Sequence, residues 1–356
     1  MELPVRRREG SRRADGPSAT LAALFAQASA GHAVIESRFI IAGQSVLMRF
    51  AGPAMHERIA RSFEHLIDDR PAVPEGDFGL TINVWDSAST ATPSPPVLGA
   101  AMQSDGTGPI YYFDVDGVRA ISRWETLSAY DSVAAEAWFW APSPDRMLSW
   151  DWASPLRAIL HWWLGRQGIL QVHGGAVGLD GGGVLIVGRG GSGKSTTSLA
   201  SLLAGLTYAG DDFVALQPSP IPYVHSLYSS GKLESHQVAR FPALASAQAN
   251  FDRLDEEKAV IYAGDVEGAT TTAGFPLRAI LVPRIAGGLA TKLAPTSAAS
   301  ALAALAPSTI FQLHPPQPGA LSLMAEIARR VPCLSLELGT DLEAIPEAIA
   351  EYLREV

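Results

Sequence analysis

The sequence has little cysteine, little lysine and few charged residues. Its single cysteine, Cys333, allows no intramolecular disulfide and no thiolate zinc cluster, and it is typical of a protein kept in a reducing compartment. Charged residues make up 18% of the 356 residues and hydrophobic residues 47%, which excludes general disorder and provides for a sizeable core. With 36 acidic and 27 basic residues, the formal charge is -9, which argues against nucleic acid or an anionic membrane as a partner. We therefore expect a cytoplasmic protein that binds neither.

Long uncharged segments suited to a membrane are also missing. The longest run without Asp, Glu, Lys or Arg extends from Leu293 to Ala325, and five prolines interrupt it. The five arginines before residue 14 are not followed by the apolar stretch of a secretory signal. We predict that residues 1–20 form a flexible basic tail, with a basic docking arm as the alternative.

Residues 21–150 have the pattern of a small α+β domain. Two hairpins are expected, one across Gly43 and one across Asp116 and Gly117. Apolar residues recur at helical spacing in 53–67, residues 78–85 alternate like a strand, and residues 87–96 are typical of a loop. No motif here carries a recognisable chemistry. Substrate recognition is the role we consider for this domain, with a scaffold that covers the tryptophan-rich face as the alternative.

A tryptophan-dense passage separates this domain from the rest of the chain. Its six tryptophans are expected to pack in a core or between domains rather than to stack on a base or a sugar: Trp138, Trp140, Trp150, Trp152, Trp162 and Trp163. From residue 169 onward, glycines punctuate apolar runs, as in an α/β nucleotide-binding domain. We place the boundary near residue 150, which makes 151–356 the second domain.

A complete phosphate-binding loop follows a short apolar strand at 184–187. Residues 188–195 read GRGGSGKS, which matches G-x-x-x-x-G-K-[ST], and a helix with Leu199, Leu202 and Leu203 on one face comes next. Glycines let backbone N–H groups surround phosphate oxygens, and the helix N-terminus adds partial positive charge. Lys194 supplies a full charge to the β- and γ-phosphates, and the Ser195 hydroxyl can ligate Mg²⁺. The expected ATP-binding residues are Gly188, Gly190, Gly191, Ser192, Gly193, Lys194, Ser195 and Thr196.

A second motif, a pair of aspartates, follows the glycine loop. Residues 206–216 read as a strand that ends in Asp211 and Asp212, 17 and 18 residues after Lys194, and a further strand. Upstream, His173 lies 15 residues before Gly188. The sequence has neither the N-K-x-D of guanine-specific GTPases nor the L-S-G-G-Q of transporter ATPases.

His173, the loop and the aspartate pair resemble, in type and spacing, the catalytic domain of HPr kinase/phosphorylase and the HprK-like serine kinases. The resemblance covers about residues 169–290. It implies a P-loop HprK-like (PEP carboxykinase-like) α/β fold that uses ATP and Mg²⁺ to phosphorylate a serine. Residues 1–150 do not look like the N-terminal domain of the HPr enzyme, and its HPr-contacting segment is not recognisable, so the chain looks closer to divergent members such as lasso-peptide precursor kinases.

The resemblance also suggests roles for individual residues. It implies Asp211 as general base and Asp212 as a Mg²⁺ ligand, although the two could be exchanged, and it places His173 beside them. Glu234 would be a further Mg²⁺ ligand, with a solvated loop charge as the alternative. Arg253 would stabilise transition-state charge, with a surface ion pair as the alternative.

The acceptor is the open question at this stage. A serine of a peptide or protein, such as a natural-product precursor peptide, is the expected acceptor. The alternatives are a small metabolite and an ATP-binding regulator without catalysis, and a homo-oligomer is left open.

Overall fold

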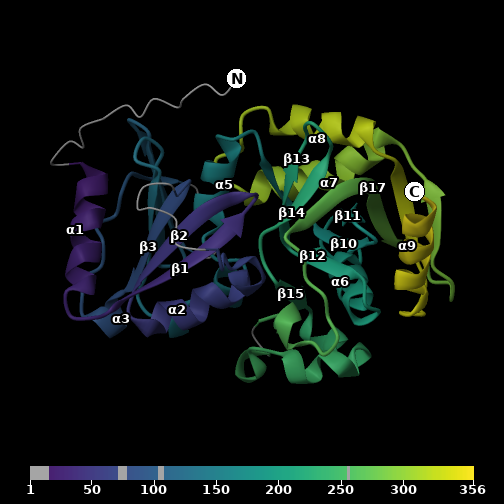
Figure 1. Ribbon diagram of the computed structural model, residues 1–356, viewed down its shortest axis with the longest axis horizontal. Coiled ribbons are helices and arrows are strands. Elements are labelled where there is room, and N and C mark those ends of the chain that lie inside the picture. Colours follow the sequence, from purple (N-terminus) through teal and green to yellow (C-terminus); the bar gives the residue numbers. More distant parts are fainter. Residues whose placement is uncertain (1–15, 71–77, 103–107, 255–256) are drawn as a thin grey trace. The chain divides into compact units, whose positions relative to one another are not determined.

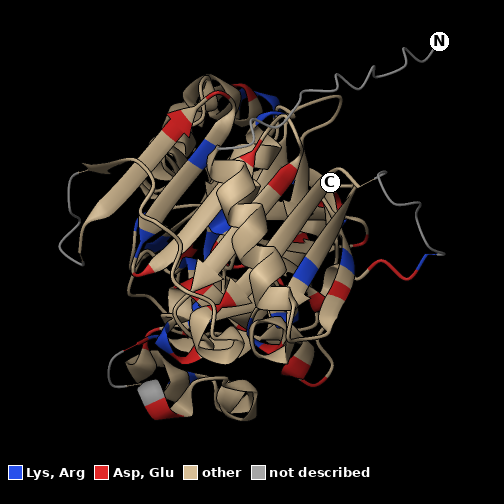
Figure 2. Ribbon diagram, turned by 90° about the vertical axis from the view of Figure 1, so that its left-hand side faces the viewer, with Lys and Arg blue, Asp and Glu red and all other residues tan. Residues whose placement is uncertain are grey.

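The computed structural model describes residues 16–70, 78–102, 108–254 and 257–356, and the chain divides into two compact units (Figure 1). Unit 1 consists of Met1–Arg38, Val46–Arg58 and Ala72–Met147. Unit 2 consists of Phe39–Ser45, Ile59–Pro71 and Leu148–Val356. Each unit contains its own sheet, and the fold as a whole is mixed α/β. In the described part of the chain, residues of both charge signs are interspersed along the ribbon (Figure 2).

Unit 1 is built on an eight-stranded sheet in the order β1-β2-β3-β8-β7-β6-β5-β4. β2, β3 and β8 are parallel neighbours, and β8 to β4 form an antiparallel meander. The strands are β1 Val34–Ile41, β2 Gln44–Ala51, β3 Leu80–Asp86, β4 Ala100–Met102, β5 Ile110–Val115, β6 Val118–Arg123, β7 Thr126–Asp131 and β8 Glu136–Ala141. Both predicted hairpins are confirmed.

The helices of this first half differ in part from the prediction. α1 spans Pro17–Ser29, so the last residues of the predicted tail are its first turn, and residues 1–15 lie outside the described residues. The predicted helix at 53–67 is α2, Pro53–Ile59, continued by the 3₁₀ helix η1, Ala60–Leu66. The predicted loop at 87–96 begins with the short helix α3, Ser87–Thr90, because the Asp86 side chain caps it by accepting from the N–H of Ser89 at 2.7 Å.

Tryptophans fill the cores of both units. Trp138 and Trp140 pack with Trp85 and with Leu21 and Phe25 of α1 in the core of unit 1. In unit 2, Trp152, Trp162 and Trp163 are at most 3% exposed. The burial of these five predicted tryptophans confirms packing for them, whereas Trp150 is only partly buried.

Unit 2 contains a nine-stranded sheet in which β12, β10, β11, β17, β14, β13 and β9 follow one another, β19 pairs with β17, and β18 pairs with β19. Its strands are β9 Leu170–His173, β10 Gly175–Leu179, β11 Gly182–Ile186, β12 Thr207–Gly210, β13 Phe213–Gln217, β14 Tyr223–Ser226, β17 Gly274–Ile285, β18 Lys292–Pro295 and β19 Cys333–Leu338. A separate hairpin pairs β15 Ser230–Leu233 with β16 Ala259–Tyr262. The larger helices are α5 Arg157–Gly165, α6 Lys194–Leu203, α7 Ala298–Gln312, α8 Ala320–Arg330 and α9 Ala344–Glu355. The shorter ones are η2 Pro144–Arg146, which unit 1 contains, and α4 Ser149–Trp152, η3 Ser235–Arg240, η4 Pro242–Ala247, η5 Phe251–Arg253 and η6 Ala263–Asp265.

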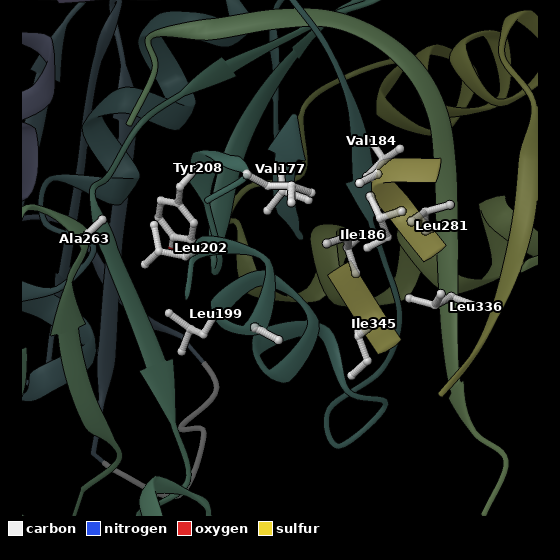
Figure 3. Close-up of a cluster of buried hydrophobic side chains, with 14 of the residues drawn as sticks. Val177, Val184, Ile186, Leu199, Leu202, Tyr208, Ala263, Leu281, Leu336 and Ile345 are labelled. Atoms are coloured by element: carbon white, nitrogen blue, oxygen red, sulfur yellow. The ribbon is translucent and has the colours of Figure 1, made fainter. Parts of the chain in front are cut away.

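The strand before the glycine loop is buried on both faces. Val184 and Ile186 of β11 pack in one cluster with α6 and α9, and this cluster is drawn in Figure 3. Leu185, in between, points into the opposite cluster with α7 and α8. The wholly apolar run at 184–187 is therefore explained by helices on both sides of the strand. No helix in the described ranges is long and apolar enough to cross a bilayer.

Candidate functional site

The carboxyl ends of four strands of unit 2 meet at one edge of its sheet. β11 is parallel to β17, and β17 is parallel to β19. β12 is antiparallel to β10, which is antiparallel to β11, so β12 also runs parallel to β11. The glycine loop follows β11 and the aspartate pair follows β12, so both lie at this edge. In open α/β sheets, ligands bind outside the carboxyl ends of the parallel strands.

The backbone of the glycine loop requires glycine at specific positions. Gly193 has φ +102, and a β-carbon there would collide with the side chain of Leu338. A β-carbon on Gly188 would lie 2.6 Å from Oγ of Ser192. Gly190 and Gly191 are exposed and have open space where a side chain would be. The loop is therefore closely packed at both ends and open in the middle, as an anion cradle requires.

Lys194 begins α6 and points back into the loop. Its side chain is buried, and Nζ donates to the carbonyl oxygens of Gly188 at 2.8 Å and Arg189 at 3.2 Å. Burial lowers the pKa of Lys194, and the charges of Asp211 and Asp212 act in the opposite direction. A phosphate oxygen can replace the two carbonyls as acceptor, and the charges of both aspartates act on this ammonium group.

Ser192 and Thr196 add hydroxyl groups in the loop and at the start of α6. The Ser192 hydroxyl is buried and has no hydrogen-bond partner among the described residues. The Thr196 hydroxyl donates to Oε1 of Gln237 at 3.1 Å. Arg189 is exposed, so it faces solvent at the mouth of the loop.

Strand register brings His173 to the aspartate pair. β10 pairs with β12 at one end of the strand order, and β9 pairs with β13 at the other end. The chain therefore passes from one of these pairs to the other twice, between β9 and β10 at 174–175 and between β12 and β13 at 211–212. His173 is opposite Phe213, and the N–H of Gly174 donates to the carbonyl of Asp212 at 3.1 Å. A β-carbon on Gly174 would lie 2.9 Å from the carbonyl oxygen of Ile186. The histidine and the aspartates therefore meet because these two connections lie side by side.

Asp211 is almost completely buried, at 2% exposure. Its Oδ2 accepts from the backbone N–H of Lys232 at 3.0 Å, while Oδ1 is buried without a hydrogen-bond partner in the described ranges. Burial raises the pKa of Asp211, the Lys232 N–H lowers it, and the nearby Ser195 side chain also lowers it. An unpartnered carboxylate oxygen beside the loop serine is suited to a metal ion or its water shell.

Asp212 has a different environment from its neighbour. Nζ of Lys232 lies 2.6 Å from Oδ2, Oγ of Ser154 donates to Oδ2 at 3.2 Å, and Nε2 of His173 lies 3.2 Å from Oδ1. Burial on its own would raise the pKa of Asp212, but Lys232 and His173 hold it well below its usual range. Asp212 is therefore an ionised carboxylate, with about 17% of its side chain open to solvent.

A glutamine contacts the other ring nitrogen of the histidine. Nε2 of Gln312, at the end of α7, lies 3.3 Å from Nδ1 of His173. With the Gln312 amide donating to Nδ1, the neutral ring would carry its proton on Nε2 and donate it to Asp212.

Sequence reasoning missed several residues of this site. Lys232 contacts both aspartates, through its backbone N–H and its ammonium group, and its side chain is only 11% exposed. Ser154 and Gln312 approach from distant parts of the chain. The available signal was the scarcity of lysine: three of the four lysines of the chain, Lys194, Lys232 and Lys258, lie at or near this edge.

Two predicted site residues have no described contact with the glycine loop or the aspartates. Glu234 is half-exposed, and its Oε1 lies 2.7 Å from Nζ of Lys258. Arg253 ends the 3₁₀ helix η5, and its side chain lies outside what the structure describes. In the described part of the chain, no cluster of three or more His, Cys, Asp or Glu side chains could hold a metal ion.

A cavity of about 890 Å³ lies elsewhere in unit 2, between the C-terminal end of α6, η4 and α9. None of the loop residues or the aspartates lines it. We therefore assign the chemistry to the strand edge and not to this cavity.

Comparison with known proteins leaves the family open. No family model and no curated protein matches the chain. Among solved structures, it is similar to the Hpr(Ser) kinase/phosphatase from Coxiella burnetii, with 15% sequence identity, a TM-score of 0.28, and coverage of 52% of this chain and 96% of that chain. A likeness at this level establishes neither family nor activity, so the function has to be inferred from the residues of the site.

Proposed function

We propose that the chain is a kinase that uses ATP and Mg²⁺ to phosphorylate a serine hydroxyl of a peptide or protein. The observation that carries the proposal is the meeting of a glycine loop, its lysine and two differently held aspartates at one strand edge. Phosphoryl transfer requires exactly such positioning and charge, and little covalent chemistry from the protein.

Binding of the triphosphate falls to the loop and the first residues of α6. Gly190 and Gly191 are exposed, so phosphate oxygens can approach their backbone N–H groups, and Lys194 exchanges its two carbonyl partners for phosphate oxygens. Asp211 and the Ser195 hydroxyl would hold Mg²⁺, because Asp211 is buried beside that serine and has a free Oδ1. Magnesium, when bound, neutralises charge on the phosphate oxygens.

The sequence favoured Asp211 as the base and Asp212 as the Mg²⁺ ligand. We propose the reverse: Asp212 is the base and Asp211 is the Mg²⁺ ligand. Asp212 is ionised, is partly open to solvent and is oriented by His173 and Lys232, whereas Asp211 is buried. A loose transition state requires an oriented carboxylate more than a strongly basic one, so the low pKa of Asp212 is compatible with the role of base. Asp212 thus accepts the hydrogen bond of the attacking hydroxyl.

The proposed step balances without any further reactant. The serine oxygen forms a bond to the γ-phosphorus as the bond between that phosphorus and the β–γ bridging oxygen breaks, and ADP leaves. The hydroxyl proton passes to Asp212 and from there to solvent. Arg253, if its side chain reaches the phosphates, would add positive charge in the transition state.

The exposure of the residues around the glycine loop and His173 supports a peptide or protein as the acceptor. Arg189, Gly190 and Gly191 are exposed, and Phe311, which precedes Gln312, is 87% exposed. An extended chain can reach a hydroxyl into such a site and cover Phe311 with an apolar side chain. A natural-product precursor peptide is the acceptor class that we would test first.

The experiment is transfer of labelled γ-phosphate from ATP, with Mg²⁺, to a panel of serine-containing peptides. We expect label in phosphoserine, and none in peptides whose serine is replaced by alanine. Label on a small metabolite alone would select the metabolite kinase instead. ATP binding without transfer to any acceptor would contradict a kinase.

Replacing Lys232 by methionine should shift the pH profile of transfer. The variant keeps the backbone N–H that Asp211 accepts but removes the ammonium group that holds the pKa of Asp212 low. Because Asp212 is active when ionised, the acidic limb of kcat/KM should move to higher pH. The profile is measured from about pH 9 down to the lowest pH at which both proteins remain folded, because the pKa of Asp212 lies well below its usual range in the wild type. Lys292→Met, at an exposed lysine of β18, is the control, and an unshifted acidic limb in Lys232→Met would rule out Asp212 as the base.

A further inference from the structure

Two large apolar side chains are exposed at the same strand edge, beyond the carboxyl end of β17. Ile285 is the last residue of β17 and is 74% exposed. Leu289, in the loop that follows, is 79% exposed. We call these two residues the apolar platform.

The backbone beneath this platform is held in place by the segment that follows β19. The N–H of Ala286 donates to the carbonyl of Leu338 at 3.0 Å, and the N–H of Thr340 donates to the carbonyl of Gly288 at 2.9 Å. A β-carbon on Gly339 would collide with the backbone of Leu289. The two loops are therefore fastened together, so the exposed side chains rest on a built support.

This support touches the glycine loop directly. The side chain of Leu338 fills the space that a β-carbon on Gly193 would need, and Cδ of Pro283 in β17 lies 4.0 Å from the same position on Gly188. The segments that carry the platform thus pack against the glycine loop (the anion cradle, residues 188–195), on the β17 side of β11.

The position of the aspartates sets the direction of a bound nucleotide. Asp211 and Asp212 follow β12, which lies on the β10 side of β11, opposite to β17. The reacting γ-phosphate has to point toward these carboxylates, so the nucleoside extends to the other side, over β17 and β19. From this geometry we propose that Ile285 and Leu289 form the surface against which the base of the nucleoside triphosphate packs, which rests on the nucleotide site proposed above.

The chemistry of the platform suits a flat, largely apolar ring. Contact with two aliphatic side chains removes apolar surface of both partners from water without requiring a particular pattern of donors and acceptors. The base therefore adds affinity to ATP. Inorganic tripolyphosphate has no base and cannot gain this affinity.

The test compares ATP with inorganic tripolyphosphate, each with Mg²⁺, by isothermal titration calorimetry. For Leu289→Ser and for the double variant Ile285→Ser/Leu289→Ser, ATP affinity should fall about tenfold or more, while tripolyphosphate affinity stays unchanged. Leu321→Ser, at a leucine of α8 that is 52% exposed, is the matched control and should change neither. Thermal unfolding of each variant verifies that it is folded.

Three outcomes would overturn the platform. ATP affinity that is unchanged in the double variant, equal losses for ATP and tripolyphosphate, or wild-type protein that binds ATP no more tightly than tripolyphosphate would each exclude a base contact at Ile285 and Leu289 while leaving the anion cradle intact. Wild-type protein that binds neither ligand would instead reject the proposed nucleotide site, and the platform with it.

Discussion

Replacing Lys194 by alanine is expected to reduce phosphoryl transfer roughly 10³-fold or more. The ammonium group lies inside the glycine loop, buried and bonded to the carbonyls of Gly188 and Arg189, and no other group in the described part of the loop carries a full positive charge inward. Without it, the charge that develops on the transferred group is left to backbone dipoles and the metal. Initial rates of label transfer to the best peptide acceptor measure the loss.

The controls separate loss of chemistry from loss of fold. Lys292→Ala removes an exposed lysine of β18 and should leave the rate unchanged. Lys194→Met keeps the apolar stem of the side chain, so it tests the charge with less change in packing. A folded Lys194→Ala protein with more than about a tenth of wild-type activity would contradict the assignment of the loop to the phosphates.

Substitution of the two aspartates by asparagine should produce two different defects. Asp212→Asn removes the carboxylate that accepts the acceptor hydroxyl, so kcat should fall about 10²- to 10³-fold while ATP affinity changes little. Asp211→Asn removes the oxygen that faces the metal, so its lost activity should be partly recovered at higher Mg²⁺ concentration.

The two variants are compared by kcat, KM for ATP and the Mg²⁺ dependence of the rate. If magnesium restores Asp212→Asn and not Asp211→Asn, the roles are the ones that the sequence first favoured. If both variants transfer phosphate at the wild-type rate, the aspartates have no catalytic role.

The sequence predicted the parts of this site that are local in the chain. The glycine loop needs only a strand, eight residues and a helix, and all three are contiguous between 182 and 203. β12, the two aspartates and β13 are likewise contiguous, between 207 and 217, and the break between the two strands lies at the aspartates. Local pattern and local geometry agree here because few distant residues are needed.

The partners of the aspartates could not be read in the same way. Lys232 follows Asp212 by 20 residues on a separate hairpin, and Gln312 reaches His173 from a separation of 139 residues. The approach of His173 to the aspartates depends on the registers of β9 with β13 and of β10 with β12, which no short pattern specifies. The choice between the two aspartates depends on these partners, which explains why the sequence left it open.

The most direct measurement is a crystal structure of the chain with Mg²⁺ and a non-hydrolysable ATP analogue. The account predicts the β- and γ-phosphates against the amides of the glycine loop and Nζ of Lys194, with the metal between the phosphates, Ser195 and Asp211, and Asp212 facing the γ-phosphorus. An analogue bound away from the loop, or a γ-phosphate separated from both aspartates by more than a layer of water, would contradict it.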